Sequence, residues 1–172
     1  MTNHQKGYRR DRQVIETITE WGTMDTEQLT LMFYPSIQVA RRRLRIMSNK
    51  GKLNRFRDAV EMPYSYYIKQ YSQTRIALNW IRLWLKMKHC RSWEVIESFD
   101  YETNTAVTRN TVGNSAKTYT VLYNVNRKTW IGENVIIIYD TEQQKREAFK
   151  RIKGILLTID DIKEGLKCVK CS

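Results

Sequence analysis

Proline and glycine are scarce in this chain of 172 residues, which has two prolines and seven glycines. That scarcity excludes a proline- or glycine-rich linker, and no segment repeats at the periods of solenoid proteins. The three cysteines are Cys90, Cys168 and Cys171. An odd number suits reduced thiols in the cytoplasm better than a disulfide framework. We therefore expect a compact chain that forms one domain or two small ones.

Long hydrophobic runs are also missing. The most apolar stretch, 76–87, is interrupted by Asn79, Arg82 and Lys86, and it is shorter than the roughly 20 residues that a membrane span needs. The first six residues are polar, so a secretory signal is not expected. These absences favour a cytoplasmic protein without a membrane partner.

Acidic residues are outnumbered by basic ones. The chain has 18 Asp and Glu against 30 Lys and Arg, which gives a formal net charge of +12. Hydrophobic residues make up 41% and aromatic residues 11%, enough to bury a core. The excess of positive charge favours a polyanionic partner.

Two helical patterns separated by a tight turn open the chain. Apolar residues recur at helical spacing over 11–21, and Gly22 then supplies the left-handed residue that commonly ends a helix. Asp25 or Thr26 can cap a second helix. That helix should stop just before Pro35, because a proline disfavours helical geometry in the residue that precedes it.

A third helix and a hairpin complete the first half. Ser36 is the expected N-cap of a helix over 37–49 that is apolar along one face. Strands are expected at 53–57 and 64–68, joined by a turn at 58–63. Three short helices followed by a hairpin predict a winged helix-turn-helix, to which we assign residues 1–71 as a DNA-binding domain.

One face of the third helix carries side chains suited to DNA. An arginine fork can bridge O6 and N7 of guanine, and glutamine can pair with adenine, whereas basic residues elsewhere suit phosphates. The predicted DNA-binding residues are Ser36, Gln38, Arg41, Arg42, Arg45 and Asn49 on or just before the third helix, Lys52, Arg55 and Arg57 around the hairpin, and Arg9 and Arg10 ahead of the first helix.

Other interpretations of this face stay open. The arginines also fit an ordinary solvated basic helix, and RNA is the nearest competing ligand. Val39 and Ile46 point away from the apolar stripe, so part of the helix is available to the hairpin or to a partner subunit.

The second half predicts a small mixed α/β sheet domain over 93–172, after a connecting helix assigned to 72–92. In that helix Arg75, Asn79, Arg82 and Lys86 form a narrow polar stripe, and its apolar remainder serves packing or dimerisation. Strands are expected at 93–102, with Trp93, Val95, Phe99 and Tyr101 facing inward, and at 119–125, 135–139 and 155–159, with helices at 141–153 and 160–166. The fold class is therefore α+β.

The order of features from Asp11 to Ile68 resembles the plasmid replication-relaxation family. The points of resemblance are Asp25-Thr-Glu-Gln-Leu, Leu31-Met-Phe, Ala40-Arg-Arg-Arg-Leu-Arg, and Gly51-Lys-Leu-Asn-Arg-Phe leading to Tyr66-Tyr67-Ile68. The resemblance implies DNA binding in plasmid or phage replication. It also implies that the second half is a reduced restriction-endonuclease-like sheet.

That family tends to carry a Glu-x-Asp-Arg-x-Thr motif at a strand end, and the best match here is Asn124-Val-Asn-Arg-Lys-Thr129. Asparagine replaces both acids, and neutral amides hold a magnesium ion poorly. The resemblance therefore implies a scaffold that has lost nuclease chemistry. On local grounds the asparagines equally fit a hairpin turn.

No other pattern predicts catalysis, a cofactor or a metal. Cys168 and Cys171 have the spacing of half a zinc site, but a second close pair is missing. Asp140 with Glu142 is explained by an N-cap and a first-turn carboxylate. We expect no enzyme and no metal site.

The sequence thus predicts a nucleoid-associated protein that binds double-stranded DNA and acts in replication, maintenance or transcriptional regulation of plasmid or phage type. A homodimer and a replication or host protein partner are further expectations. The first alternative is a protein-interaction factor that uses the second domain, and the next is a metal-dependent nuclease.

Overall fold

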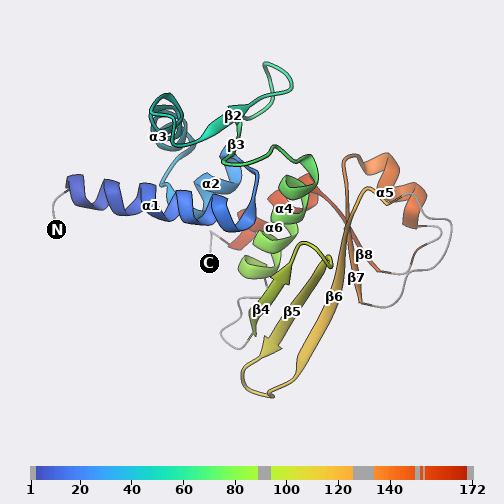
Figure 1. Cartoon of the computed structure of the whole chain (residues 1–172). Coiled ribbons are helices and arrows are strands. Elements are labelled where there is room, and N and C mark those ends of the chain that lie inside the picture. The colour runs from blue at the N-terminus through green and yellow to red at the C-terminus, as the bar shows by residue number, and fades with distance from the viewer. Residues whose placement is uncertain (1–2, 89–93, 126–133, 150–151, 153, 170–172) are drawn as a thin grey trace. The chain divides into compact units, whose positions relative to one another are not determined.

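The computed structural model describes residues 3–88, 94–125, 134–149, 152 and 154–169 (Figure 1). Within these ranges the side chains of 3–6, 88, 94 and 167–169 are not described. The chain divides into two compact units, Met1–Asn79 and Trp80–Ser172. The division falls inside helix α4, Gln73–Lys88. Helices with a small antiparallel sheet form the first unit, and a mixed sheet with helices forms the second, so the fold is α+β.

The first unit contains three helices before α4 and three very short strands. The helices are α1 (Asn3–Trp21), α2 (Thr26–Phe33) and α3 (Ile37–Asn49), and the strands are β1 (Met24–Asp25), β2 (Asn54–Phe56) and β3 (Ser65–Tyr67). The strands pair antiparallel in the order β1-β3-β2. The predicted hairpin is therefore confirmed as β2–β3. Strand β1 adds a third strand that was not predicted, because it is only two residues long.

Local capping explains where these helices begin and end. The Asp25 side chain accepts from the Gln28 backbone N–H at 2.8 Å, and the Gln28 side chain accepts from the Asp25 N–H at 3.1 Å, which is a capping box. Ser36 Oγ accepts from the Val39 N–H at 3.4 Å. Gly22 has φ of 78° as predicted. The expected caps at Asp25 and Ser36 are confirmed.

The expected start of the first helix is wrong. Helix α1 begins at Asn3 rather than near Asp11, so Arg9 and Arg10 lie within the helix and not ahead of it. Hydrophobic periodicity marks a helix only where it buries a face, and the first two turns have no apolar stripe. Straight-chain residues there still favour helix.

The core of the first unit is built from the apolar faces of its helices. Val14, Ile18, Leu29, Ala40 and Leu44 are all 1% exposed or less. Two buried side-chain amides tie α4 to other elements of the first unit. Gln28 Nε2 donates to the Ile76 carbonyl at 2.7 Å, and Asn79 Nδ2 donates to the Thr23 carbonyl at 2.9 Å. Asn79 is 0% exposed, so this member of the predicted polar stripe is buried and hydrogen-bonded.

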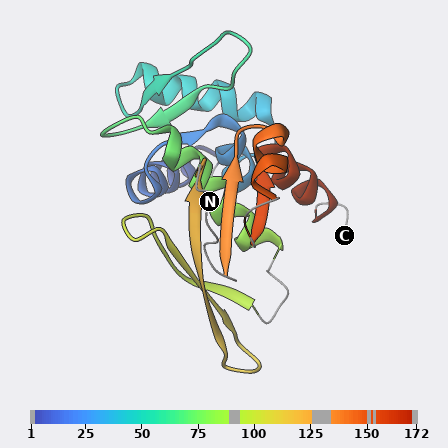
Figure 2. The ribbon, with the colours of Figure 1, turned by 90° about the vertical axis from the view of Figure 1, so that its right-hand side faces the viewer.

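The second unit holds a five-stranded sheet in the order β4-β5-β6-β7-β8. The strands are β4 (Glu94–Asp100), β5 (Thr105–Asn110), β6 (Ala116–Tyr123), β7 (Val135–Tyr139) and β8 (Ile155–Thr158), and the helices are α5 (Glu142–Phe149) and α6 (Ile159–Val169). Strands β4, β5 and β6 pair antiparallel, whereas β6, β7 and β8 pair parallel. The β5–β6 hairpin projects beyond the ends of β7 and β8 (Figure 2).

The parallel part of this sheet follows the sequence closely. All five residues of β7 are buried, as its continuous apolar run predicts. Val135, Ile137, Tyr139 and Ile152 form one core cluster with Leu122, Ala148 and Leu156. The predicted strand-helix-strand unit β7-α5-β8 is confirmed.

The antiparallel part differs from expectation in two ways. Strand β5 was not expected. In addition, Val95 is 46% exposed instead of facing inward. The β4–β5 register shifts between Ile96 and Ser98, and such a bulge reverses the alternation of side chains between the two faces of a strand.

The apolar residues of α4 are covered within the single chain. Ile76, Ala77, Leu78, Ile81 and Leu85 are 5% exposed or less, which agrees with a packing role for this helix, and dimerisation through it stays a prediction. In the part of the chain that the structure describes, no helix combines the length and apolarity of a membrane span.

Candidate nucleic-acid interface

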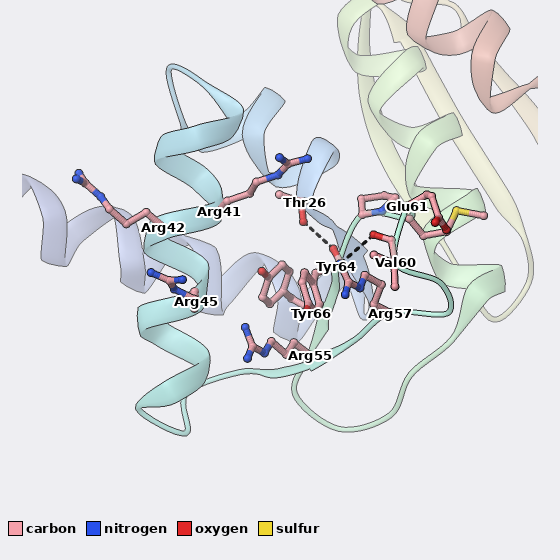
Figure 3. A pocket seen from close by; sticks show the side chains of 12 residues that line it. Thr26, Arg41, Arg42, Arg45, Arg55, Arg57, Val60, Glu61, Tyr64 and Tyr66 are labelled. Atoms are coloured by element: carbon pink, nitrogen blue, oxygen red, sulfur yellow. Dashed lines mark hydrogen bonds between the residues drawn. The ribbon is translucent and has the colours of Figure 1, made fainter.

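A pocket of about 500 Å³ lies between α3 and the β2–β3 hairpin (Figure 3). We call it the arginine pocket, because five arginines line it: Arg41, Arg42 and Arg45 from α3, and Arg55 and Arg57 from the hairpin. The remaining lining residues are Thr26, Val60, Glu61, Met62, Pro63, Tyr64 and Tyr66. Five of the eleven predicted DNA-binding residues are therefore brought together.

The arginines of α3 face solvent. The buried positions of that helix are Ala40, Leu44 and Met47, so residues on the opposite side are pushed outward by the 3.6-residue period. Arg41, Arg42 and Arg45 are exposed. Among the described residues no carboxylate forms an ion pair with any of these three arginines. Their donors are available to an anion from outside.

The hairpin arginines are organised by Tyr64. The guanidinium carbons of Arg55 and Arg57 lie 5.1 and 4.5 Å from the centre of the Tyr64 ring, within the range of a cation–π interaction. Arg57 also donates from Nη1 to the Val60 carbonyl at 3.0 Å. These contacts hold two cations beside the pocket without neutralising either one.

Thr26 fixes the hairpin to the helices. Its backbone N–H and its hydroxyl both donate to the Tyr64 carbonyl, at 2.9 and 2.8 Å. Strand β3 also pairs with β1 at Met24 and Asp25. The hairpin side of the arginine pocket is therefore hydrogen-bonded to β1 and to the start of α2, as Figure 3 shows for Thr26 and Tyr64.

Tyr66 forms the floor of the pocket and is 2% exposed. Burial raises the pKa of its hydroxyl above the ordinary value, since a phenolate is poorly solvated there. Tyr66 therefore stays neutral near pH 7. Glu61 on the hairpin turn is the one acidic side chain that lines the pocket, so the balance of charge is strongly positive.

The three α3 arginines point in different directions (Figure 3). Arg41 reaches toward Thr26, whereas Arg42 points away from the hairpin. Gln38 and Asn49 are also exposed on α3. Ser36 is occupied as the N-cap of the helix, so its hydroxyl has a structural task besides any contact with a ligand.

The other predicted residues lie elsewhere. Arg9 and Lys52 line a separate groove beside α1. Arg10 is half-buried, with its guanidinium 5.6 Å from the centre of the Tyr34 ring, which makes it less available than the others.

Two features of the interface were missed at the sequence level. Tyr64 and Tyr66 were read only as strand residues, although an aromatic residue next to basic ones is a signal for cation–π stacking. The ion pair between Asp11 and Arg43 joins residues 32 positions apart, and no local pattern reports such a contact.

The strand ends of the second unit were the other place to look for chemistry. Tyr123 donates to the Asp140 carboxylate, at 2.8 and 3.0 Å from its two oxygens, and Asn124 also donates to it. The helix cap is Thr141 and not Asp140 as expected. Thr141 Oγ1 accepts from the Gln144 N–H at 3.3 Å, and Gln144 Oε1 accepts from the Thr141 N–H at 3.2 Å.

The remaining candidates fall outside the described residues. These are 126–129 of the possible nuclease motif and, of the three cysteines, Cys90, Cys171 and the side chain of Cys168. Across the described ranges, no three His, Cys, Asp or Glu side chains are grouped to hold a metal ion. Comparison with protein-family models, with curated proteins and with solved structures finds no match, so the resemblance to the replication-relaxation family stays a prediction from its motifs.

Proposed function

We propose that the first unit is a winged helix-turn-helix module that binds double-stranded DNA, with α3 as the recognition helix and the β2–β3 hairpin as the wing. The observation that carries this proposal is the arginine pocket. Five guanidinium groups from α3 and the hairpin line this pocket. None of the three α3 arginines forms an ion pair with a carboxylate of the described residues.

The dimensions and chemistry suit this ligand. A helix with its side chains is about 10–12 Å across, and the major groove of B-DNA is about 12 Å wide. With α3 in the groove, Arg42 points toward base edges. Arg55 and Arg57 on the hairpin then lie beside the phosphates that border the groove.

The biological role that we propose follows the sequence resemblance. DNA binding without catalysis would serve replication, maintenance or transcriptional control of a plasmid or phage, with the second unit as a scaffold or docking surface. The net charge of +12 supports a nucleic-acid partner for the chain as a whole.

The test is a titration of a fluorescent 30-base-pair duplex at several salt concentrations. The wild-type chain should bind with a steep salt dependence, because each phosphate contact contributes a slope of about −0.9. The double variant Arg42→Ala with Arg45→Ala should bind at least about ten times more weakly. Circular dichroism checks that the variant is folded.

A matched control separates local contacts from total charge. Lys86→Ala with Lys117→Ala also removes two exposed cations, both from the second unit. This control should bind DNA nearly as well as the wild type. An absence of duplex binding at low salt, or an equal loss in both double variants, would overturn the proposal.

A further inference from the structure

A second groove runs along the other side of α3, between its C-terminal half and α1. One part has a volume of about 340 Å³ and is lined by Gly7, Tyr8, Asp11, Arg43, Ile46, Met47, Lys50 and Lys52. An adjoining part shares Tyr8, Asp11 and Lys52, and continues along α1 past Arg9, Arg12, Ile15 and Glu16. We call the two parts together the α1 groove.

The α1 groove carries a net positive charge. Its two acids are already paired. Asp11 accepts from Arg43, and Glu16 accepts from Arg12 at 2.8 Å. Three further cations, on Arg9, Lys50 and Lys52, are exposed and form no ion pair with the described residues. The groove therefore offers three uncompensated cations to an anion.

The arginine pocket and the α1 groove lie on opposite sides of α3. Successive side chains are rotated by about 100° around the helix axis. The mean direction of Arg41, Arg42 and Arg45 around that axis differs by about 150° from the mean direction of Arg43, Ile46, Met47 and Lys50. The face of α3 between these two directions carries three exposed residues, Gln38, Arg42 and Asn49.

We propose that the α1 groove binds the sugar-phosphate backbone of the second DNA strand. This inference rests on the proposed function. A duplex major groove is bordered by two phosphate backbones, one from each strand. With α3 inserted, one backbone meets the arginine pocket and the other meets Lys50 and Lys52. The face that carries Arg42 then lies between them, against the base edges.

The early start of α1 is what builds this groove. Gly7 and Tyr8 precede Asp11 and line the groove only because the helix already runs through them. The consequence is strand selectivity. A single strand can occupy one basic surface, whereas only a duplex presents a backbone to each of them at once.

The experiment compares a 30-base-pair duplex with one of its strands, using Lys50→Ala with Lys52→Ala. Both lysines are exposed, and circular dichroism checks the fold. We expect duplex affinity to fall at least about tenfold and the salt slope to decrease by about 2. Affinity for the single strand should change less than about threefold. Lys86→Ala with Lys117→Ala is again the control for charge.

A hydroxyl-radical footprint gives a second readout. The wild type should protect two backbone tracts, one on each strand, that face each other across one major groove. The Lys50 and Lys52 variant should lose one tract and keep the other. The charge reversals Lys50→Glu with Lys52→Glu should enlarge both effects.

The failures of the two proposals are distinguishable. If the wild type binds no duplex, DNA binding itself is wrong. If the wild type binds but the lysine variant keeps its affinity, its salt slope and both footprint tracts, the α1 groove does not hold the second strand. An equal loss on duplex and on single strand also overturns the groove proposal, and it leaves DNA binding standing.

Discussion

The Asp11 carboxylate accepts two hydrogen bonds from the Arg43 guanidinium, at 2.8 Å from Nε and 2.6 Å from Nη2. Asp11 is 5% exposed, so the pair is shielded on the side of α1. Hydrogen bonding to Asp11 raises the pKa of Arg43 above its ordinary value. A planar, two-point contact of this kind fixes direction as well as distance. It therefore sets how α1 lies against the proposed recognition helix.

Asp11→Asn should destabilise the first unit. The amide keeps the shape of the carboxylate, but it removes the negative charge and turns one acceptor oxygen into a donor. The Arg43 side chain is 36% exposed, so water compensates in part, and we expect a loss of about 1–3 kcal/mol in the free energy of unfolding. Urea denaturation followed by tryptophan fluorescence measures it.

Arg12→Ala is the control for this prediction. Arg12 pairs with Glu16 on the same helix at 2.8 Å, and the two side chains are 82% and 59% exposed. Exposed pairs at this spacing contribute only about 0.3–0.5 kcal/mol. A loss in Asp11→Asn no larger than in Arg12→Ala would show that the half-buried Asp11–Arg43 pair does not stabilise the unit.

Tyr34→Phe should leave the protein as stable as before at neutral pH, or raise its stability by up to about 1 kcal/mol. The Tyr34 side chain is 7% exposed, and its hydroxyl has no hydrogen-bond partner among the described residues. Removing an unpaired buried hydroxyl costs nothing in the folded state, and the ring that faces Arg10 is kept. A destabilisation above 1 kcal/mol in urea would contradict this account.

The same variant predicts a change of stability with pH. Burial, helped by the charge of Asp11, raises the pKa of Tyr34 from 10.0 to about 12. From about pH 10 upward the unfolded chain loses this proton while the folded chain keeps it. The free energy of unfolding therefore falls as the pH rises from about 10 to about 12. Wild-type stability should fall more steeply than that of Tyr34→Phe in urea titrations between these values. Parallel curves would contradict the raised pKa.

Where sequence prediction succeeded, a local physical cause was present. Asp25, Ser36 and Gly22 each mark a helix end by their own chemistry, and the apolar run of β7 reflects burial on both faces. The outward face of α3 could also be predicted from the sequence, because the apolar residues of the opposite face repeat at the helical period.

The failures of prediction had two causes, a local turn signal that was not used and contacts between residues distant in sequence. Strand β5 is framed by turns that Asp100 and Asn110 stabilise. Asp100 accepts from the Glu102 N–H at 2.8 Å, and Asn110 accepts from the Gly113 N–H at 3.0 Å. These residues were a usable turn signal. The bulge beside Ser98 and the Asp11–Arg43 pair depend on partners that are distant in sequence, so no local pattern predicts them.

Gly154→Ala should destabilise the second unit more than Gly51→Ala destabilises the first. A Cβ at Gly154 would lie 2.9 Å from the backbone oxygen of Val135, which cannot rotate away. Gly51 has φ of 68° and open space around it, so alanine there costs only the backbone penalty of about 1 kcal/mol. Thermal unfolding of both variants gives the order, and a greater loss in Gly51→Ala would contradict it.

Arg42 and Arg55 should affect DNA recognition in different ways. Arg42 points away from the hairpin, toward the base edges in the proposed complex. Arg55 lies against Tyr64, beside the phosphates. Losing a base contact relaxes sequence preference at that position, whereas losing a phosphate contact weakens binding to all sequences alike. Selection of bound duplexes from a random pool distinguishes the two effects. Arg55→Ala should recover the wild-type motif at lower affinity, and Arg42→Ala should recover a motif degenerate at one or two positions. The reverse assignment would mean that α3 is rotated in the groove from the orientation inferred here.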